Sequence, residues 1–342
     1  MARNRIYLDR NENNYGPAPA CYAALRRADM TRLSWYDRSY VSGIRGVLTD
    51  RLARDFGVSE DRVLLGYGAE NILKQTIQCY LAPGQKLMVP AYSWWYYKKI
   101  ASEVGGLSVE FPMTVGTDRF SYDLAGMRAV YAREHPAVVF ISSPNNPTGN
   151  SLAPADLEAI LADFAAAVVV LDEAYIFDTT SDYVRRLIDA HPRLLVVRTM
   201  SKYYALAGMR IGFALMGSGL SALAQFSNRY LGFNRLAEDV AIAALDSPEY
   251  YRGIAANMEA DKELYYGKLG SLPGFRVYRS DANFILAALD PAHRAGLKAH
   301  LERENLFIKF MDEPLLDSHV RITIGTQEEN RLLIDAITAF YD

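Results

Sequence analysis

Hydrophobic residues in this chain fall into short runs, many of them β-branched, that alternate with amphipathic stretches. Several runs are continuously apolar, a pattern typical of strands covered on both faces and therefore of a mostly parallel sheet. Seven strands are predicted, at residues 63–65, 86–89, 107–111, 137–141, 167–171, 194–197 and 211–215. We predict a large α/β domain with a mostly parallel seven-stranded sheet covered by helices.

The remaining segments predict helices and a second, smaller domain. Apolar positions at helical spacing indicate helices at 19–27 and 43–56 and a long helical region at 220–269. Beyond Pro273, strands are predicted at 275–278, 283–286, 306–310 and 320–324, with helices at 291–305 and 327–341. This texture predicts a small α+β domain.

Polar residues together with Gly16 and Pro17 make segment 7–17 an irregular arm, which is able to pack on either domain. The expected divisions are an arm and interface segment at 1–40, a large domain at 41–270 and a small domain at 271–342.

Composition narrows the function classes. The chain has 342 residues, half of them hydrophobic, and a net charge of −3, which gives no reason to expect a nucleic acid partner. No apolar run is long enough to span a membrane, and the polar N-terminus lacks the core of a secretory signal. Two cysteines in apolar surroundings suit the reducing cytoplasm, and the scattered histidines argue against a metal site.

One lysine, Lys202, lies between two of the predicted strands, in the stretch 198–213. Burying an ammonium group is unfavourable unless it is paired or neutralised. One use of such a lysine is as an amine that forms a Schiff base with a carbonyl compound or with pyridoxal phosphate. Taken alone, Lys202 is better explained as a solvated loop lysine, and the other residues at the strand ends change this interpretation.

Polar residues follow several predicted strands, at the sheet edge where open α/β proteins bind ligands. Asp172 follows an apolar run and needs a cationic partner, such as a protonated pyridine nitrogen, a salt bridge or a helix N-terminus. Asn146 precedes Pro147, and a following proline favours an extended backbone. The segment either aims the side-chain amide of Asn146 at a ligand or is a plain turn. Ser201 and Arg210 offer phosphate donors, although Arg210 also fits a surface position.

Two further segments complete the set. The glycines at 66–68 lead into a helix at Ala69 and Glu70, which suits a phosphate or simply a tight turn. The aromatic block at 92–97 offers a ring for stacking, or packs into a core or interface. Together these residues supply the amine, carboxylate, stacking ring and phosphate donors that pyridoxal phosphate requires.

The chain resembles the fold-type I, aspartate-aminotransferase-like enzymes that use pyridoxal phosphate. Within them it is similar to the histidinol-phosphate aminotransferase family, which also includes threonine-phosphate decarboxylase. The resemblance covers nearly the whole chain, and four motifs carry it: Pro144-Asn-Asn-Pro-Thr-Gly149, Asp172-Glu-Ala-Tyr175, Arg198-Thr-Met-Ser-Lys202 and Leu206-Ala-Gly-Met-Arg210.

The resemblance implies roles for the matching positions. Lys202 would form the Schiff base and move the proton between the substrate carbon and the cofactor, and Asp172 would keep the pyridine nitrogen protonated. Asn146 and Tyr175 would hydrogen-bond the ring hydroxyl, and Trp95 would stack on the ring. The phosphate would be held by Gly68, Ala69, Glu70, Ser201, Arg210 and, across the interface of a homodimer with shared sites, Tyr36.

The substrate is expected to be an amino acid or an amine derived from one. Arg321 matches the arginine that grips the α-carboxylate, and Lys309, Asn146 and Tyr15 would complete the substrate side. Lys309 stands where the family usually has an arginine for the substrate phosphate, and lysine lacks the bidentate fork. Asp37 stands where a proline usually follows the tyrosine, and the aromatic block also departs from the pattern. These departures point away from histidine biosynthesis towards another amino acid.

Three functions follow from these observations. The first is an aminotransferase that uses pyridoxal phosphate in two half-reactions. The second keeps the cofactor but decarboxylates, eliminates, cyclises or oxidises, according to which bond at Cα is perpendicular to the ring. The third, least expected, is a non-catalytic binding module of the same fold.

Overall fold

The computed structural model describes residues 5–38, 45–177, 181–227 and 231–342. Its largest sheet has seven strands in the order β2-β10-β9-β8-β7-β3-β4. Their bounds are β2 (Val63–Tyr67), β3 (Lys86–Pro90), β4 (Leu107–Phe111), β7 (Val138–Ser142), β8 (Val168–Asp172), β9 (Leu194–Thr199) and β10 (Ile211–Met216). Only β10 runs against its neighbours, β2 and β9. The seven predicted strands and the mostly parallel sheet are confirmed.

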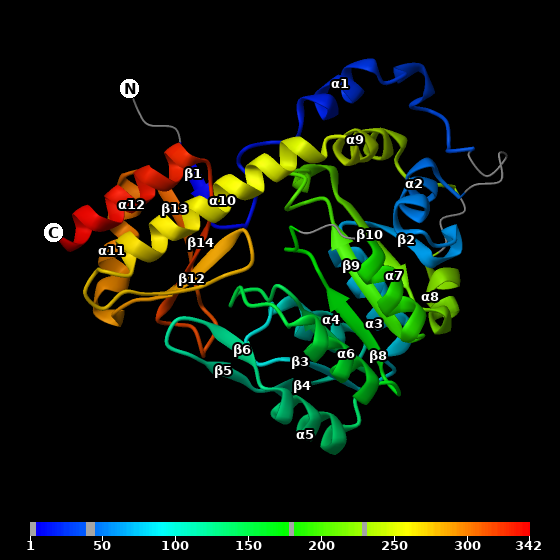
Figure 1. Cartoon of the computed structure of the whole chain (residues 1–342), viewed down its shortest axis with the longest axis horizontal. Coiled ribbons are helices and arrows are strands. Elements are labelled where there is room, and N and C mark those ends of the chain that lie inside the picture. The colour runs from blue at the N-terminus through cyan, green and yellow to red at the C-terminus, as the bar shows by residue number, and fades with distance from the viewer. Residues whose placement is uncertain (1–4, 39–44, 178–180, 228–230) are drawn as a thin grey trace.

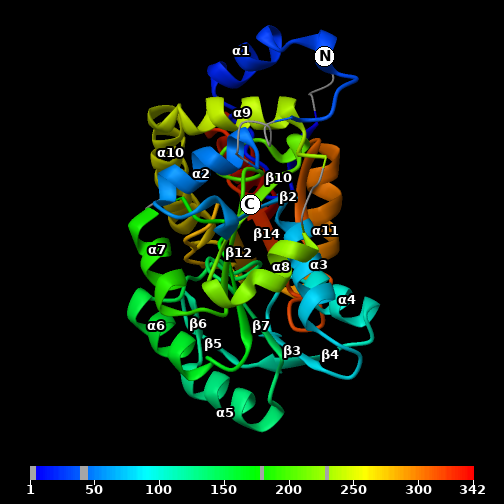
Figure 2. The same cartoon turned by 90° about the vertical axis from the view of Figure 1, so that its right-hand side faces the viewer.

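Both faces of this sheet are buried, which explains the continuous apolar runs. In β7, Val139 and Ile141 join one core cluster, whereas Val138 and Phe140 join the other. The helices of one face are α3 (Ala69–Tyr80), α4 (Tyr96–Glu103) and α8 (Ser221–Phe226), and those of the other are α2 (Val47–Phe56), α5 (Leu124–Glu134), α6 (Pro154–Asp163) and α7 (Ser181–Ala190). Figure 2 shows the two sets on either side of the strands.

A second sheet has five strands in the order β1-β13-β14-β12-β11. It contains β1 (Ile6–Leu8), β11 (Arg276–Tyr278), β12 (Phe284–Ala288), β13 (Leu306–Phe310) and β14 (His319–Thr323), and it is accompanied by α11 (Pro291–Arg303) and α12 (Gln327–Tyr341). The predicted C-terminal strands and helices are confirmed to within a few residues. Strand β1 was not predicted. It pairs in parallel with β13, so the start of the arm belongs to this sheet.

The predicted helical region at 220–269 divides into α8, α9 (Arg235–Leu245) and α10 (Pro248–Leu269), with residues 228–230 outside the described parts. Helix α10 reaches from the large sheet to the small one (Figure 1). Helix α1 (Pro19–Arg27) packs against α9. Residues 43 and 44 of the predicted helix 43–56 are not described, and α2 begins at Val47.

The smaller elements are a ribbon of β5 (Met113–Val115) and β6 (Phe120–Tyr122) and single 3-10 turns at Met30–Arg32, Glu60–Arg62, Ala207–Met209 and Ser218–Leu220. The divisions at 40/41 and 270/271 stay predictions, and the first of them lies outside the described residues.

Candidate active site

The strand ends that the sequence singles out meet at one edge of the large sheet. Asp172 ends β8 and pairs in register with Ser142 of β7 and Val197 of β9. Because β10 runs the other way, its first residue pairs with Tyr67 at the end of β2. Arg210 therefore lies beside the loop that follows β2, although 142 positions separate it from Gly68.

The carboxylate of Asp172 is almost fully buried and has two donors. The backbone N–H of Ala174 donates to Oδ1 at 3.0 Å, and the hydroxyl of Tyr97 donates to Oδ2 at 2.5 Å. Burial raises the pKa of Asp172 to about 6, while these two hydrogen bonds oppose the shift. A cation beside it would restore the ionised form.

Tyr175 stands between the two sheets. Its hydroxyl accepts hydrogen bonds from the side-chain amides of Asn11 at 3.1 Å and Asn146 at 3.3 Å. Burial raises the pKa of this phenol, and the charge of Arg321 opposes the rise. The phenol is therefore protonated at neutral pH.

The amine of Lys202 lies 5.6 Å from the centre of the Tyr175 ring. Its Nζ donates a 2.9 Å hydrogen bond to the backbone carbonyl of Arg10, in the N-terminal arm. Burial first, and then the charge of Arg321, lower the pKa of Lys202 to about 8. The amine is thus far easier to deprotonate than a solvated lysine.

Arg321 lies in β14 and reaches across to the large sheet. Nη1 donates to Asn146 Oδ1 at 2.6 Å, and Nη2 donates to the backbone carbonyl of Asp9 at 2.8 Å. Nε is buried with no hydrogen-bond partner among the described residues. The guanidinium is therefore held at two points and retains an unused donor.

A close backbone approach shapes the loop after β2. Gly68 precedes the first residue of α3 and has φ +78°, a conformation that favours glycine. A Cβ at Gly68 would lie 2.5 Å from Arg210 Nη2, and one at Gly212 would lie 2.5 Å from the backbone nitrogen of Ala69. Arg210 Nη2 also lies 3.6 Å from the carboxylate of Glu70. A helix N-terminus beside an arginine forms a suitable cradle for a phosphate.

Ser201 lies just after β9, and Lys309 lies beside Arg321 in the small sheet. The hydroxyls of Ser201 and Thr199 lie 2.9 Å apart at the end of β9. Lys309 is paired in register with Arg321, and its Nζ donates to Asp312 Oδ2 at 2.7 Å. Lys309 therefore lies beside Arg321 with its charge already compensated by Asp312, and its contact with a substrate stays a prediction.

The other predicted residues lie further out. Trp95 immediately precedes α4 and is 54% exposed, with its ring edge-on to Tyr96. Tyr36 is 66% exposed. Tyr15 packs against the core with a buried hydroxyl. Their contacts to cofactor or substrate stay predictions.

From the sequence, no role was assigned to four residues that make contacts in the site. The carbonyls of Asp9 and Arg10 act through the backbone, which carries no side-chain signal. Asn11 takes a left-handed φ of +54°, which asparagine tolerates, and so turns its amide to Tyr175. Its position in a polar arm was the only available sign. Tyr97 was visible only as one of a block of aromatics.

In the parts of the chain that are described, no helix is both long and apolar enough to cross a bilayer. No three His, Cys, Asp or Glu side chains there converge as a metal site.

Comparison with known proteins matches this geometry to a family. The family model described as aminotransferase class I and II matches residues 3–337. The chain belongs to the aminotransferase class I and II family. It is 33% identical over 337 residues to the histidinol-phosphate aminotransferase of Symbiobacterium thermophilum, covering 98% of this chain and 90% of the relative. It is 31% identical over 336 residues to that of Roseiflexus castenholzii, covering 97% and 88%.

Among solved structures, the histidinol-phosphate aminotransferase of Sinorhizobium meliloti in complex with pyridoxal 5′-phosphate superposes with a TM-score of 0.84. The identity is 25%, and the match covers 99% of this chain and 92% of that one. The fold is therefore fold-type I, and the chain is a transferase that uses pyridoxal phosphate to move amino groups. The residues described above fit this cofactor, because the buried acid, the lysine and the glycine cradle beside Arg210 lie at one edge.

Proposed function

We propose that the enzyme transfers the amino group of an amino acid, with Lys202 as the cofactor-bearing amine and Arg321 as the carboxylate-binding residue. One chain of contacts carries this proposal. Lys202 Nζ faces the ring of Tyr175, whose hydroxyl accepts from Asn146, which in turn accepts from Arg321. An amine and an anion-binding guanidinium are thereby held on either side of two hydrogen-bonding groups.

Pyridoxal phosphate, when bound, supplies an aldehyde that condenses with amines and a ring that withdraws electrons from the substrate carbon. Asp172 would face the ring nitrogen, because a buried acid with a raised pKa gains from a neighbouring cation. Asn146 and Tyr175 would hold the ring hydroxyl, and Trp95 would cover one face of the ring.

Lys202 combines the two properties that its role needs. With a pKa of about 8, an appreciable fraction of the amine is neutral and nucleophilic at neutral pH. The same nitrogen, once free, would move the proton at the substrate carbon. In the structure, the backbone carbonyl of Arg10 accepts a hydrogen bond from Nζ and orients it.

The phosphate would lie at the N-terminus of α3. The backbone of Gly68, Ala69 and Glu70, the hydroxyl of Ser201 and the side chain of Arg210 would bind it. The carboxylate of Glu70 lies 3.6 Å from Nη2 of Arg210. Both side chains are partly exposed, so this ion pair adds little to stability. A bound phosphate would take the place of Glu70 beside Arg210.

The substrate side favours a carboxylate. Arg321 offers a charged fork, and the carbonyl of Asp9 that accepts from it carries no charge, so a carboxylate would be the stronger partner. Lys309 would bind a second anion on the substrate only by giving up its ion pair with Asp312. We therefore propose an amino acid substrate, with Tyr15 and the arm closing the far side, rather than a substrate that depends on a strongly held second phosphate.

We further propose a homodimer with shared sites. Tyr36 belongs to a group of exposed apolar side chains around a hollow of about 750 Å³. The members are Leu33, Trp35, Tyr36, Val47, Tyr67 and Leu231. Such patches mark interfaces, and this one adjoins Gly68 through Tyr67. Sedimentation should show a dimer that the double substitution Leu33→Asp and Trp35→Asp dissociates, whereas a monomeric wild type would refute it.

We also propose a cytoplasmic location, supported by the free thiols of Cys21 and Cys79. The division into domains at 41–270 and 271–342 is kept as a proposal, with β1 added to the small domain.

A panel of amino acids, with histidinol phosphate included, tests the function. Each compound is mixed with the loaded enzyme, and the absorbance of the cofactor is followed together with formation of the keto product. We expect at least one carboxylate-bearing amino acid to be converted, and Lys202→Ala to convert none. Carbon dioxide or ammonia released without a keto acceptor would instead indicate another reaction.

A further inference from the structure

In the aromatic block at 92–97, the side chain of Tyr97 contacts Asp172, one of the predicted cofactor-binding residues. Tyr97 is 1% exposed, and its hydroxyl donates a 2.5 Å hydrogen bond to Asp172 Oδ2. The ring is fixed edge-on to Phe140 at 5.1 Å and to Trp94 at 5.7 Å. Neither the resemblance nor the strand-end argument assigns this residue a role.

This hydrogen bond acts on the charge of the acid. Burial and the neighbouring carboxylate of Glu173 disfavour the ionised form of Asp172, whereas the bonds from Tyr97 and Ala174 favour it. Burial also holds the pKa of Tyr97 well above its usual value, so its hydroxyl stays protonated and remains a donor. Ala174 and Tyr97 each take a different carboxylate oxygen, which fixes the plane of the group.

We propose that Tyr97 is a positioning residue, whose hydroxyl keeps Asp172 ionised and oriented so that the shared proton stays on the ring nitrogen of bound pyridoxal phosphate. The proposal rests on the placement of Asp172 opposite that nitrogen. Two bases that share one proton divide it by their relative proton affinities. A donor on the carboxylate lowers the proton affinity of Asp172 and leaves the proton on the ring.

Loss of the hydroxyl would shift the proton towards Asp172 and free the carboxylate to rotate. The ring would then withdraw electrons less strongly from the substrate carbon. A merely structural tyrosine would change stability alone.

The test is the ¹⁵N chemical shift of the ring nitrogen of labelled pyridoxal phosphate bound to the holoenzyme. Tyr97→Phe keeps the ring and its packing and removes only the donor. We expect its signal to move towards that of an unprotonated pyridine nitrogen. The cofactor dissociation constant should rise about tenfold and kcat should fall about tenfold, as for loss of one charge-assisted hydrogen bond, with a smaller change in KM.

Tyr265→Phe is the matched control. This tyrosine lies in α10, away from Asp172, and is also fully buried. Its hydroxyl donates a 3.1 Å hydrogen bond to Asn330. We expect it to lower stability and to leave the nitrogen signal unchanged. A wild-type signal and wild-type cofactor affinity in Tyr97→Phe would overturn the proposal.

Two further variants separate the possible failures. Asp172→Asn should abolish the protonated nitrogen signal; if it does not, the placement of Asp172 is wrong. In the Asp172→Asn background, Tyr97→Phe should weaken cofactor binding no further, whereas additive losses would contradict the proposal. If Tyr97→Phe fails to fold, Tyr97→Gln takes its place, because glutamine keeps a hydrogen-bond donor. We expect this variant to retain the signal of the protonated nitrogen, and loss of that signal would contradict the proposal.

Discussion

Nη1 of Arg321 donates a 2.6 Å hydrogen bond to the side-chain oxygen of Asn146, although 175 positions separate the two residues. Arg321 comes from the small sheet and Asn146 from the loop after β7 of the large one. The amide of Asn146 continues to Tyr175. The guanidinium that would bind substrate is therefore oriented by a group that would bind the cofactor.

The first prediction concerns this fork. Arg321→Lys keeps the charge but loses the bidentate geometry and the bond to Asn146. We expect KM for the amino acid substrate to rise about 10- to 100-fold, as for loss of a charge-assisted pair, with a smaller fall in kcat. Steady-state kinetics measure both. Arg279→Lys, in a surface ion pair with Glu263, is the control and should change neither.

The second prediction concerns the pH dependence of Lys202. Its pKa is lowered to about 8, mainly by burial and then by Arg321. Only the neutral amine attacks an aldehyde, so the rate of pyridoxal phosphate uptake by the cofactor-free enzyme should rise with pH and level off above about 8. Stopped-flow absorbance measures this rate. An inflection near the ordinary lysine value would show that the amine is solvated.

The third prediction concerns the cradle at Gly68. Alanine there must adopt a φ of +78° and place its Cβ against Arg210. We expect Gly68→Ala to lose about 1–2 kcal/mol of stability and to weaken cofactor binding about tenfold or more, because Arg210 must move. Gly84→Ala is the control, because it has a similar φ of +80° with open space around it. It should lose stability and keep cofactor affinity; equal affinity losses in both variants would contradict the account.

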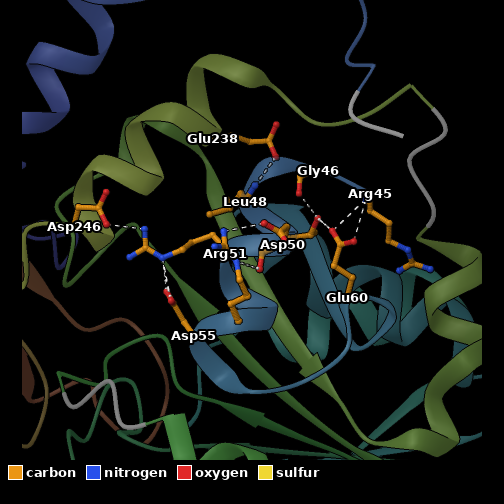
Figure 3. A network of polar contacts seen from close by, with 11 residues as sticks. Arg45, Gly46, Leu48, Asp50, Arg51, Asp55, Glu60, Glu238 and Asp246 are labelled. Atoms are coloured by element: carbon orange, nitrogen blue, oxygen red, sulfur yellow. Dashed lines mark hydrogen bonds and ion pairs between the residues drawn. The ribbon is translucent and has the colours of Figure 1, made fainter. Parts of the chain in front are cut away.

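The fourth prediction concerns a buried acid at the start of α2 (Figure 3). Gly46 offers no side-chain cap, and Glu238 of α9 instead accepts from the N–H of Leu48 at 3.1 Å. Its other oxygen is buried with no partner among the described residues. Burial, with Asp37 and Asp239, raises the pKa of Glu238 to about 7, although the bond from Leu48 opposes the shift.

A folded-state pKa above the unfolded value means that folding favours the protonated acid. The stability from Glu238 is therefore fully present below pH 4.5, the ordinary value, and is lost as pH rises through about 7. We expect the wild type to lose about 2–3 kcal/mol more than Glu238→Gln between pH 4.5 and pH 8. Chemical denaturation at several pH values measures the difference, and parallel curves for the two proteins would refute it.

The sequence predicted the large sheet well because burial on both faces leaves continuous apolar runs such as Val138–Ile141. It also predicted that Asp172 and Lys202 lie at one edge of this sheet, because the ends of parallel strands meet there. Strand β1 is three residues long and carries only one fully buried side chain, Leu8, so its pattern is too short to detect. Contacts made by the carbonyls of Asp9 and Arg10, or by Tyr97 from the first turn of α4, depend on chain crossings that no local pattern encodes.

The central claim is that Lys202 carries the cofactor and the reaction. Its most direct test is reduction of the pyridoxal phosphate-loaded enzyme with borohydride, followed by digestion and peptide mass spectrometry. The account predicts the reduced cofactor on Lys202 alone, and no amino transfer by Lys202→Ala. A cofactor label on another lysine, or unchanged transfer in that variant, would contradict it.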